Sequence, residues 1–197
     1  MIEKEILNNL YFTERKSVKE IAALMSCSSG RIFYWMEKYK IQRRSRSVAI
    51  YLKNNPIGDP FCLKKIKNTE DAKLLGLGLG LYWGEGNRKN KNTIRLGNTN
   101  PLLINAFLRF LIVILGIRKS KLRFGLQIFS DISEEESVQF WLREMHEFGI
   151  VRKQFFKVTI TPSRGIGNYL EKSQYGVLTV YYCNSKLKKI LDSMLPM

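Results

Sequence analysis

Hydrophobic residues recur at helical spacing along the first forty positions, and capping residues divide them into three short segments. The first segment covers residues 2–11. Ser17 precedes the second, with Glu20 three positions later as in a capping box, and Ser28 or Ser29 precedes the third. Each segment would place its apolar residues on one side of a helix. The pattern therefore predicts a small module of three helices.

The pattern weakens between this module and the rest of the chain. Residues 49–67 show little periodicity, and Pro56, Gly58 and Pro60 would interrupt a helix there. We interpret this stretch as a linker. The expected organisation is a helical module, a linker and a larger domain, at residues 1–48, 49–67 and 68–197.

Helical and strand patterns alternate in the larger domain. Asn68 or Thr69 caps its first helix, Asn100-Pro101 opens a long apolar helix, and Ser133 caps another. Segments of alternating polarity lie between and after these helices. This order predicts an α+β domain with helices on one face of an antiparallel sheet. Strands are expected at residues 93–98, 120–130, 155–161 and 176–183.

The polar positions of these strands share one phase. Arg95, Arg123 and Thr159 alternate with apolar residues that would face the helices. No Asp or Glu interrupts the polar set, whereas an ordinary solvated face would mix charges of both signs. Both interpretations stay open, and contact with nucleic acid is favoured. The expected contacts are Arg95, Lys121, Arg123, Gln127, Lys157 and Thr159.

The overall charge supports an anionic partner. The chain of 197 residues has 33 Lys and Arg against 17 Asp and Glu, which gives a formal net charge of +16. Such an excess attracts polyanions, of which DNA is the commonest in a cell. Hydrophobic residues make up 45% of the chain, enough for packed cores rather than a disordered basic tail. A ribosomal protein or a membrane-surface binder remains the alternative to a DNA-binding protein.

Other classes of function are disfavoured by the composition. Cys27, Cys62 and Cys183 are far apart and suit neither a zinc site nor a disulfide framework, which fits a reducing cytoplasm. His146 is the single histidine, so a metal would need carboxylate ligands. No secretory signal is visible, and the longest apolar run, near Phe110, is too short to span a bilayer. We expect a cytoplasmic protein without a membrane partner, associated with the nucleoid if its source is a prokaryote.

The second and third predicted helices, joined by a short turn, have the pattern of a helix-turn-helix that binds double-stranded DNA. Polar and basic residues on the third helix would face the major groove, and the basic segment after it would follow the DNA backbone. The module resembles the helix-turn-helix modules of resolvases and DNA-binding regulators, and a plain three-helix bundle is the alternative. The expected contacts are Ser28, Ser29, Arg31, Tyr34 and Lys38 in the helix, and Arg43, Arg44 and Arg46 after it.

Glycines mark the first helix of the larger domain. Gly76, Gly80 and Gly84 recur every four residues and therefore lie on one helix face. Each glycine costs about 1 kcal/mol relative to alanine inside a helix, so such a face makes sense where another backbone approaches closely. We expect this face to form a dimer interface. An apolar core helix that merely ends at glycines is the alternative.

The end of this helix resembles the motif of the LAGLIDADG homing endonucleases. The residues that carry the resemblance run from Gly80 to Gly86, Gly-Leu-Tyr-Trp-Gly-Glu-Gly, and the following order of strand, Asn-Pro and long helix also agrees. The resemblance implies that two such helices pack together and that Glu85 binds a divalent metal, here Mg²⁺, in a site that hydrolyses double-stranded DNA. One motif per chain then implies a homodimer. Lys157 is a candidate catalytic contact to phosphate, and further DNA contacts are expected from Arg88, Lys89 and Lys91 after the motif.

The leading expectation is therefore a site-specific DNA endonuclease of the homing type. Trp83 stands where the family often has an acid, which leaves open a non-catalytic transcriptional regulator built on the same fold. An RNA-binding or RNA-splicing cofactor is a third class.

Overall fold

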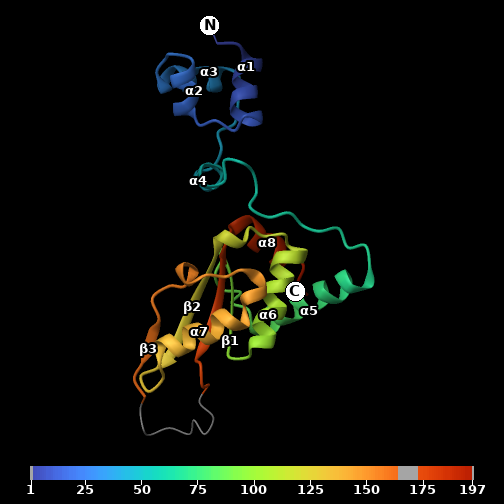
Figure 1. The fold of residues 1–197 in the computed structure, drawn as a ribbon. Helices are drawn as coiled ribbons and strands as arrows, with labels where there is room; N and C mark the ends of the chain where they lie inside the picture. Colours follow the sequence, from blue (N-terminus) through green and yellow to red (C-terminus); the bar gives the residue numbers. More distant parts are fainter. Residues whose placement is uncertain (1, 164–172, 197) are drawn as a thin grey trace. The chain divides into compact units, whose positions relative to one another are not determined.

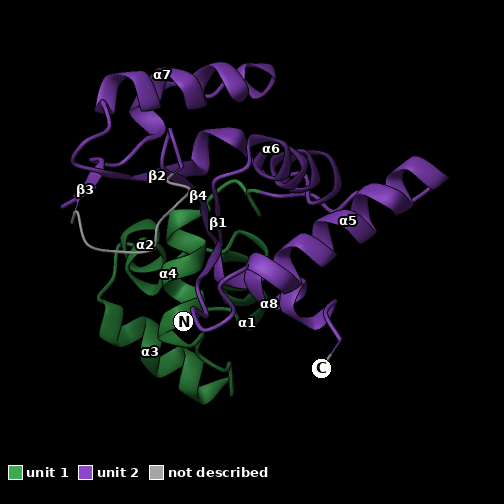
Figure 2. Cartoon of the chain, turned by 90° about the horizontal axis from the view of Figure 1, so that it is seen from below, with its two compact units in different colours: residues 1–60 green, residues 61–197 purple. Residues whose placement is uncertain are grey.

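The computed structural model describes residues 2–163 and 173–196 (Figure 1). The chain forms two compact units, unit 1 with residues 1–60 and unit 2 with residues 61–197 (Figure 2). Unit 1 is helical, and unit 2 combines helices with a four-stranded sheet. The protein is thus α+β, as the sequence predicts.

Unit 1 contains the three predicted helices. The Ser17 hydroxyl accepts a hydrogen bond from the N–H of Glu20, and the Glu20 carboxylate accepts one from the N–H of Ser17 at 2.7 Å, which completes the capping box. Ser28 caps the third helix by accepting from the N–H of Arg31. The elements are α1 (Lys4–Asn8) with a following π-helical turn (Asn9–Thr13), α2 (Val18–Leu24) and α3 (Ser29–Lys38). Their shared core includes Leu7, Tyr11, Ile21, Ile32 and Met36.

A fourth helix, α4 (Arg46–Asn54), occupies the first part of the segment interpreted as a linker. Ser45 caps it by accepting from the N–H of Val48. No residue of α4 is buried, and Val48 and Ile50 are about half exposed, at 46% and 50%. Its apolar residues nevertheless recur at helical spacing as clearly as those of α3, so the sequence could have predicted this helix, and Pro56, Gly58 and Pro60 lie after its end.

The last part of the predicted linker belongs to unit 2. The N–H groups of Cys62 and Lys64 donate to the carbonyl oxygens of Gly116 at 3.1 Å and Ile114 at 2.8 Å. Gly116 has a φ of +58°, and a Cβ there would collide with the Cys62 carbonyl. This glycine therefore both ends a helix and lets the incoming segment pack on it.

Within the described residues, unit 2 combines four strands with four α-helices. Asn68 and Ser133 act as the predicted N-caps. Among the residues that the structure describes, no helix is long and apolar enough to cross a membrane. The helices are α5 (Thr69–Glu85), α6 (Pro101–Arg109) with a π-helical extension (Phe110–Ile114), α7 (Glu134–Glu144) and α8 (Ser185–Ser193). The strands are β1 (Thr93–Asn98), β2 (Leu122–Phe129), β3 (Thr159–Thr161) and β4 (Val177–Cys183).

The sheet has the strand order β1-β4-β2-β3, and β3 lies at its outer edge in Figure 1. β4 pairs antiparallel with β1 and β2, but β3 pairs parallel with β2. The expectation of an antiparallel sheet is therefore wrong at this edge. The connection from β2 to β3 passes through α7, and such a crossover returns the chain to the same end of the sheet.

Helices cover one face of the sheet. Leu96, Val180 and Phe124 form a cross-strand row on β1, β4 and β2, and all three are fully buried. They belong to one hydrophobic core with Phe107 of α6 and Leu187 of α8. α5 and α7 contribute Tyr82 and Trp141 to the same core. The opposite face of the sheet is not covered by these helices, and it carries the exposed residues Arg95, Arg123 and Gln127.

The segment around β3 departs from the predicted alternation. A strand was expected at residues 155–161, but only Thr159–Thr161 pair as one. Phe156 and Ile160, which the alternation assigned to the core, are 49% and 54% exposed. A 3₁₀ turn (Arg152–Gln154) precedes this segment, and irregular backbone breaks the period of two on which the prediction depends.

Candidate nucleic-acid interface

Three of the predicted DNA contacts of α3, Arg31, Tyr34 and Lys38, lie on one exposed side of this helix. Burial of Ile32 and Met36 turns the opposite side of α3 outward. The Lys38 ammonium lies over the Trp35 ring, 4.8 Å from its centroid, so this cation is held along the helix. The hydroxyl oxygen of Ser28 is already engaged as the N-cap. The exposed members are Ser28, Arg31, Tyr34 and Lys38, and Ser29 is half-buried.

Arg44 is not a free member of the basic segment after α3. Its guanidinium donates to the carbonyl oxygens of Arg15 and Lys16, both at 3.1 Å, and makes a further short hydrogen bond to that of Tyr11. The guanidinium also lies 3.9 Å from the centroid of the Tyr11 ring. Arg44 therefore fastens the segment after α3 to the turn that follows the first helix, and its contact with DNA stays a prediction. The expected contacts that stay exposed are Arg43 and Arg46.

The uncovered face of the sheet carries a cross-strand row of Arg95, Tyr181 and Arg123. The Arg95 guanidinium lies over the Tyr181 ring at 5.1 Å, and Phe156 meets the same ring edge-on at 5.5 Å. A Cβ at Gly125 would lie only 3.1 Å from a ring carbon of Tyr181, so the ring lies low over this strand. Tyr181, absent from the predicted contacts, thus helps to hold Arg95 at the surface.

Arg123, at the other end of this row, is anchored to its own backbone. Its guanidinium donates to the carbonyl oxygens of Ser120 and Leu122, at 2.8 and 2.7 Å. A guanidinium has five N–H donors, and both of these bonds start from one nitrogen. Arg123 therefore keeps donors for a phosphate while its position is fixed.

The remaining predicted sheet residues do not all share this surface. Gln127 and Thr159 are paired across β2 and β3, and the Gln127 amide donates to the Thr161 hydroxyl at 3.1 Å. Lys121, by contrast, lies in a 3₁₀ turn before β2, and Lys157 precedes β3. The strand phase expected for these two lysines is wrong, because the strands begin after them.

Glu85 is the last residue of α5, and its side chain is exposed. Gly86 turns the chain out of the helix, and a Cβ at this position would collide with the Tyr82 carbonyl. The Asn87 side-chain oxygen then accepts from the N–H groups of Lys89 and Asn90, which orders the start of the loop before β1. The predicted contacts in this loop are all exposed: Arg88, Lys89 and Lys91.

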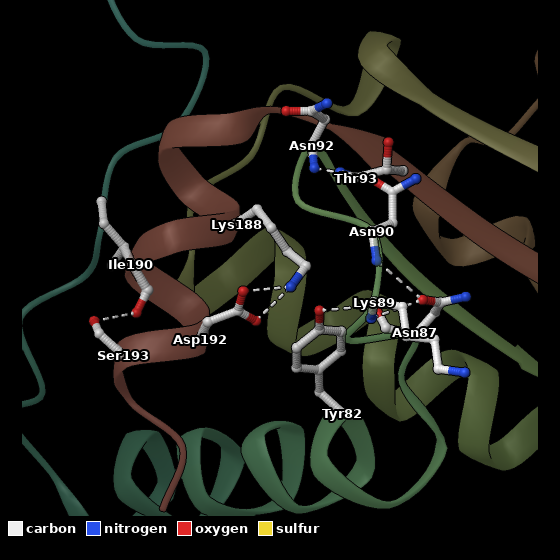
Figure 3. Close-up of polar contacts among 10 residues, drawn as sticks. All are labelled: Tyr82, Asn87, Lys89, Asn90, Asn92, Thr93, Lys188, Ile190, Asp192 and Ser193. Carbon is white, nitrogen blue, oxygen red and sulfur yellow. Dashed lines mark hydrogen bonds and ion pairs between the residues drawn. The ribbon is translucent and has the colours of Figure 1, made fainter. Parts of the chain in front are cut away.

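An ion pair between the buried Lys188 and the partly exposed Asp192 supports the end of α5 (Figure 3). The fully buried Lys188 of α8 pairs with the Asp192 carboxylate, and its ammonium lies 5.7 Å from the centroid of the Tyr82 ring. Burial lowers the pKa of Lys188, but hydrogen bonds to Asp192 and Tyr82 outweigh it and leave the pKa raised above its ordinary 10.5. Burial also raises the pKa of Tyr82. Because the Tyr82 hydroxyl lies 3.5 Å from the Asn87 carbonyl, this cluster links α8 to the loop beside Glu85.

The three-glycine face of α5 is open. Gly76, Gly80 and Gly84 have nothing within 4 Å of an added Cβ among the described residues. Leu77 and Trp83 are each 51% exposed on the same helix. The close approach that the glycines suggested occurs instead at Gly78, where a Cβ would collide with the Phe110 ring of the α6 extension.

A metal site at Glu85 is incomplete within one chain. Among the described residues, no three His, Cys, Asp or Glu side chains gather where they could hold a metal ion. A hard cation such as Mg²⁺ takes several oxygen ligands, of which protein carboxylates supply one or two. Beside Glu85, the other oxygen ligands of such a cation would have to come from water, from a phosphate or from a second chain.

Comparison of the chain with protein-family models, with curated proteins and with solved structures found no match.

Proposed function

We propose that this protein is a site-specific endonuclease for double-stranded DNA that acts as a homodimer with Mg²⁺. The observation that carries the proposal is the position of Glu85. It is an exposed carboxylate at the end of a helix whose adjoining face is apolar, rich in glycine and open. Two such helices in contact would bring two carboxylates together.

The basic surfaces support DNA as the substrate. Arg95 and Arg123 lie on the uncovered face of the sheet, and Arg88, Lys89 and Lys91 lie in the loop directly after Glu85. Cations of this kind neutralise phosphates, and arginine in the major groove also recognises guanine. In unit 1, the exposed side of α3 adds Arg31 and Lys38.

Within the dimer, each chain has a defined task at the scissile phosphates. Bound Mg²⁺ would polarise a phosphoryl oxygen and lower the pKa of a bound water. Glu85 supplies an anionic oxygen ligand, and the loop cations hold the DNA backbone beside it. Lys157, although it lies outside the strand, is exposed near β3 and remains a candidate contact to phosphate.

A non-catalytic regulator of transcription is the second candidate. Two observations favour it: no metal-binding group forms among the described residues, and Trp83 exposes half of its indole where the LAGLIDADG motif often has an acid. Such a protein would use the same DNA-binding surfaces without cutting.

Cleavage of a DNA library that includes the flanks of the protein's own gene tests the proposal. The purified protein is incubated with Mg²⁺, and cut ends are sequenced. We expect the wild type and Glu70→Gln, which changes another exposed carboxylate of α5, to cut at one preferred site. Glu85→Gln is expected to bind the same DNA without cutting. Metal-independent binding, no cut ends from the wild type and full DNA affinity of Glu85→Gln would together reject the endonuclease in favour of the regulator.

A further inference from the structure

Unit 1 contains a cavity of about 810 Å³, whose lining includes Arg43 and Arg46 of the basic segment after α3. It is lined by the turn between the first helix and α2, by Phe33 of α3, and by the segment from Arg43 through α4 to Pro56. Small-molecule sites commonly have volumes of about 300–1,000 Å³. The cavity is therefore large enough for a ligand the size of a nucleotide.

The lining is strongly basic. Two acids line the cavity, and both are engaged: Glu20 in its capping box, and Glu14 with Lys16 at 3.4 Å. The Ser17 hydrogen bonds hold the pKa of Glu20 below its ordinary value. The basic residues of the lining outnumber these acids by seven to two: Arg15, Lys16, Lys19, Arg43, Arg44, Arg46 and Lys53.

Apart from Lys16, these cations have no ion pair within the described part of the chain. Arg43 lies 5.4 Å from the centroid of the Phe33 ring, and Arg46 and Lys53 lie at the two ends of α4. A bound anion would reduce the repulsion among the positive charges of Arg43, Arg46 and Lys53. Phosphate suits it well, because guanidinium groups donate paired hydrogen bonds to phosphate oxygens.

The cavity also has an apolar wall. Phe33 and Ile50 are 40% and 50% exposed and belong to the lining, together with Val18. Since α4 buries none of its own residues, a ligand between α4 and the three-helix core would give its apolar side chains a packing partner. A purely electrostatic groove along DNA would not need this wall, whereas the base and sugar of a nucleotide would pack against it.

We propose that this cavity is a binding site for a nucleotide, with its phosphates on Arg43, Arg46 and Lys53 and its base against Phe33 and Ile50. The nucleotide is either free in solution or one unit of a nucleic acid strand. The inference goes beyond the proposed function, because it needs neither Glu85 nor the sheet of unit 2. It gives α4 a role as the element that closes one side of the site.

Calorimetric titration of the full chain with adenosine triphosphate in a metal-free buffer tests the site. The key variant carries Arg43→Gln, Arg46→Gln and Lys53→Gln. The matched control carries Lys4→Gln, Lys40→Gln and Lys67→Gln, which remove the same charge at exposed positions outside the cavity lining. We expect the key variant to weaken binding about tenfold or more relative to the control, since charge-assisted bonds to phosphate are lost. Circular dichroism of each variant confirms that the helices form.

Two further arms distinguish the source of the nucleotide and the contribution of the wall. A 16-base-pair duplex that displaces the triphosphate from the wild type assigns the site to a nucleic acid strand, and simultaneous binding assigns it to free nucleotide. Phe33→Ala should weaken binding of adenosine triphosphate more than that of inorganic triphosphate, which has no base. Equal losses in the key and control variants, or no binding of either triphosphate by the wild type, would overturn the proposal. Neither result would bear on cleavage at Glu85.

Discussion

Arg43, Arg44 and Arg46 are neighbours in one basic segment, yet they are placed in different ways. Arg44 donates to three backbone carbonyls and stacks on Tyr11, whereas Arg43 and Arg46 are exposed. The sequence shows the charge of each arginine but not the carbonyl oxygens around it. Those carbonyls come from a turn about thirty positions earlier, so no local pattern contains them.

Arg44→Gln should therefore destabilise unit 1 rather than weaken DNA binding directly. Loss of hydrogen bonds from a charged donor to partly buried carbonyls costs about 1–3 kcal/mol. Arg43→Gln, next to it, should change stability by less than about 0.5 kcal/mol. Hydrogen exchange of the α1–α3 amides in the full chain measures both. Equal protection in the two variants would show that the Arg44 contacts contribute nothing.

Lys188 and Asp192 form an ion pair in which only the lysine is buried, so substitutions of the two residues should change stability by different amounts. Asp192 is 41% exposed at its side chain, whereas Lys188 is 1% exposed. Lys188→Met replaces the ammonium with an apolar group and leaves a carboxylate that water can solvate, so it should cost about 1 kcal/mol or less. Asp192→Leu strands a buried cation and should cost about 3–5 kcal/mol. Urea unfolding measured at the buried Trp141 distinguishes them.

The raised pKa values of Lys188 and Tyr82 predict how stability changes at alkaline pH. The pKa of Lys188 is raised above 10.5 and that of Tyr82 above 10.0, so the folded state holds both protons more tightly than the unfolded state. This stabilisation is complete below pH 10 and is lost as the pH rises through the raised values. Lys188→Met should reduce the loss of stability with rising pH, because the variant has no ammonium to deprotonate at this position. An identical alkaline profile in the variant would contradict the assignment of the charge to Lys188.

At the scale of elements, local signals predicted most of the fold. Caps at Ser17, Asn68 and Ser133 lie where the sequence placed them, and the alternation in β1 and β2 correctly separates the buried side from the open side. The incorrect or missing predictions concern tertiary structure, apart from α4, whose helical spacing is present in the sequence. The parallel pairing of β3 depends on the path of the chain through α7.

The candidate site was predicted in part for the same reason. The phase of β4 could have identified Tyr181, since it alternates with the buried Val180 and Tyr182. The role of Tyr181 could not be predicted from β4 alone, because Arg95 and Gly125 contact its ring from β1 and β2. Lys157 was misplaced because the period of two was extended through residues that are not in a strand.

The sheet makes a prediction that belongs to this scale. Replacing Arg95 and Arg123 together with Gln should reduce the salt slope of duplex binding by about two, since each phosphate contact releases roughly one counterion. The control is the pair Arg109→Gln and Arg152→Gln, which changes arginines bound to Glu147 and Glu134 instead. Fluorescence anisotropy at several salt concentrations gives the slopes. If the sheet variant and the control keep the same slope, the arginines of the sheet face only solvent.

At the scale of the whole molecule, the charge of +16 is distributed over both units. The exposed side of α3 in unit 1 and the open sheet in unit 2 are separate basic surfaces on one chain. Under the proposed function, binding of one surface to DNA would raise the effective concentration of the other. The two surfaces together would then select a long site without strong binding at either one. Duplication of the chain in a dimer would double this length.

The homodimer is therefore the prediction on which the proposed activity depends most. Gly80→Leu places a branched side chain in the middle of the open face of α5, where two backbones would have to approach. Among the described residues of its own chain, nothing lies within 4 Å of an added Cβ at this position. The variant should fold normally, sediment as a monomer and lose cleavage. Lys189→Leu, on the exposed side of α8, adds a similar apolar group elsewhere and should keep the dimer.

Analytical ultracentrifugation of both variants, with and without Mg²⁺, measures this effect. Two Glu85 carboxylates at the axis would repel each other, and a divalent cation between them would relieve the repulsion. The wild-type dimer should therefore tighten with Mg²⁺, and Glu85→Gln should dimerise equally well with or without the metal. The preferred DNA site should be palindromic where the two sheets contact it, because the symmetry of the protein is imposed on the DNA. A wild-type protein that stays monomeric on DNA and cuts an asymmetric site would rule out the dimer.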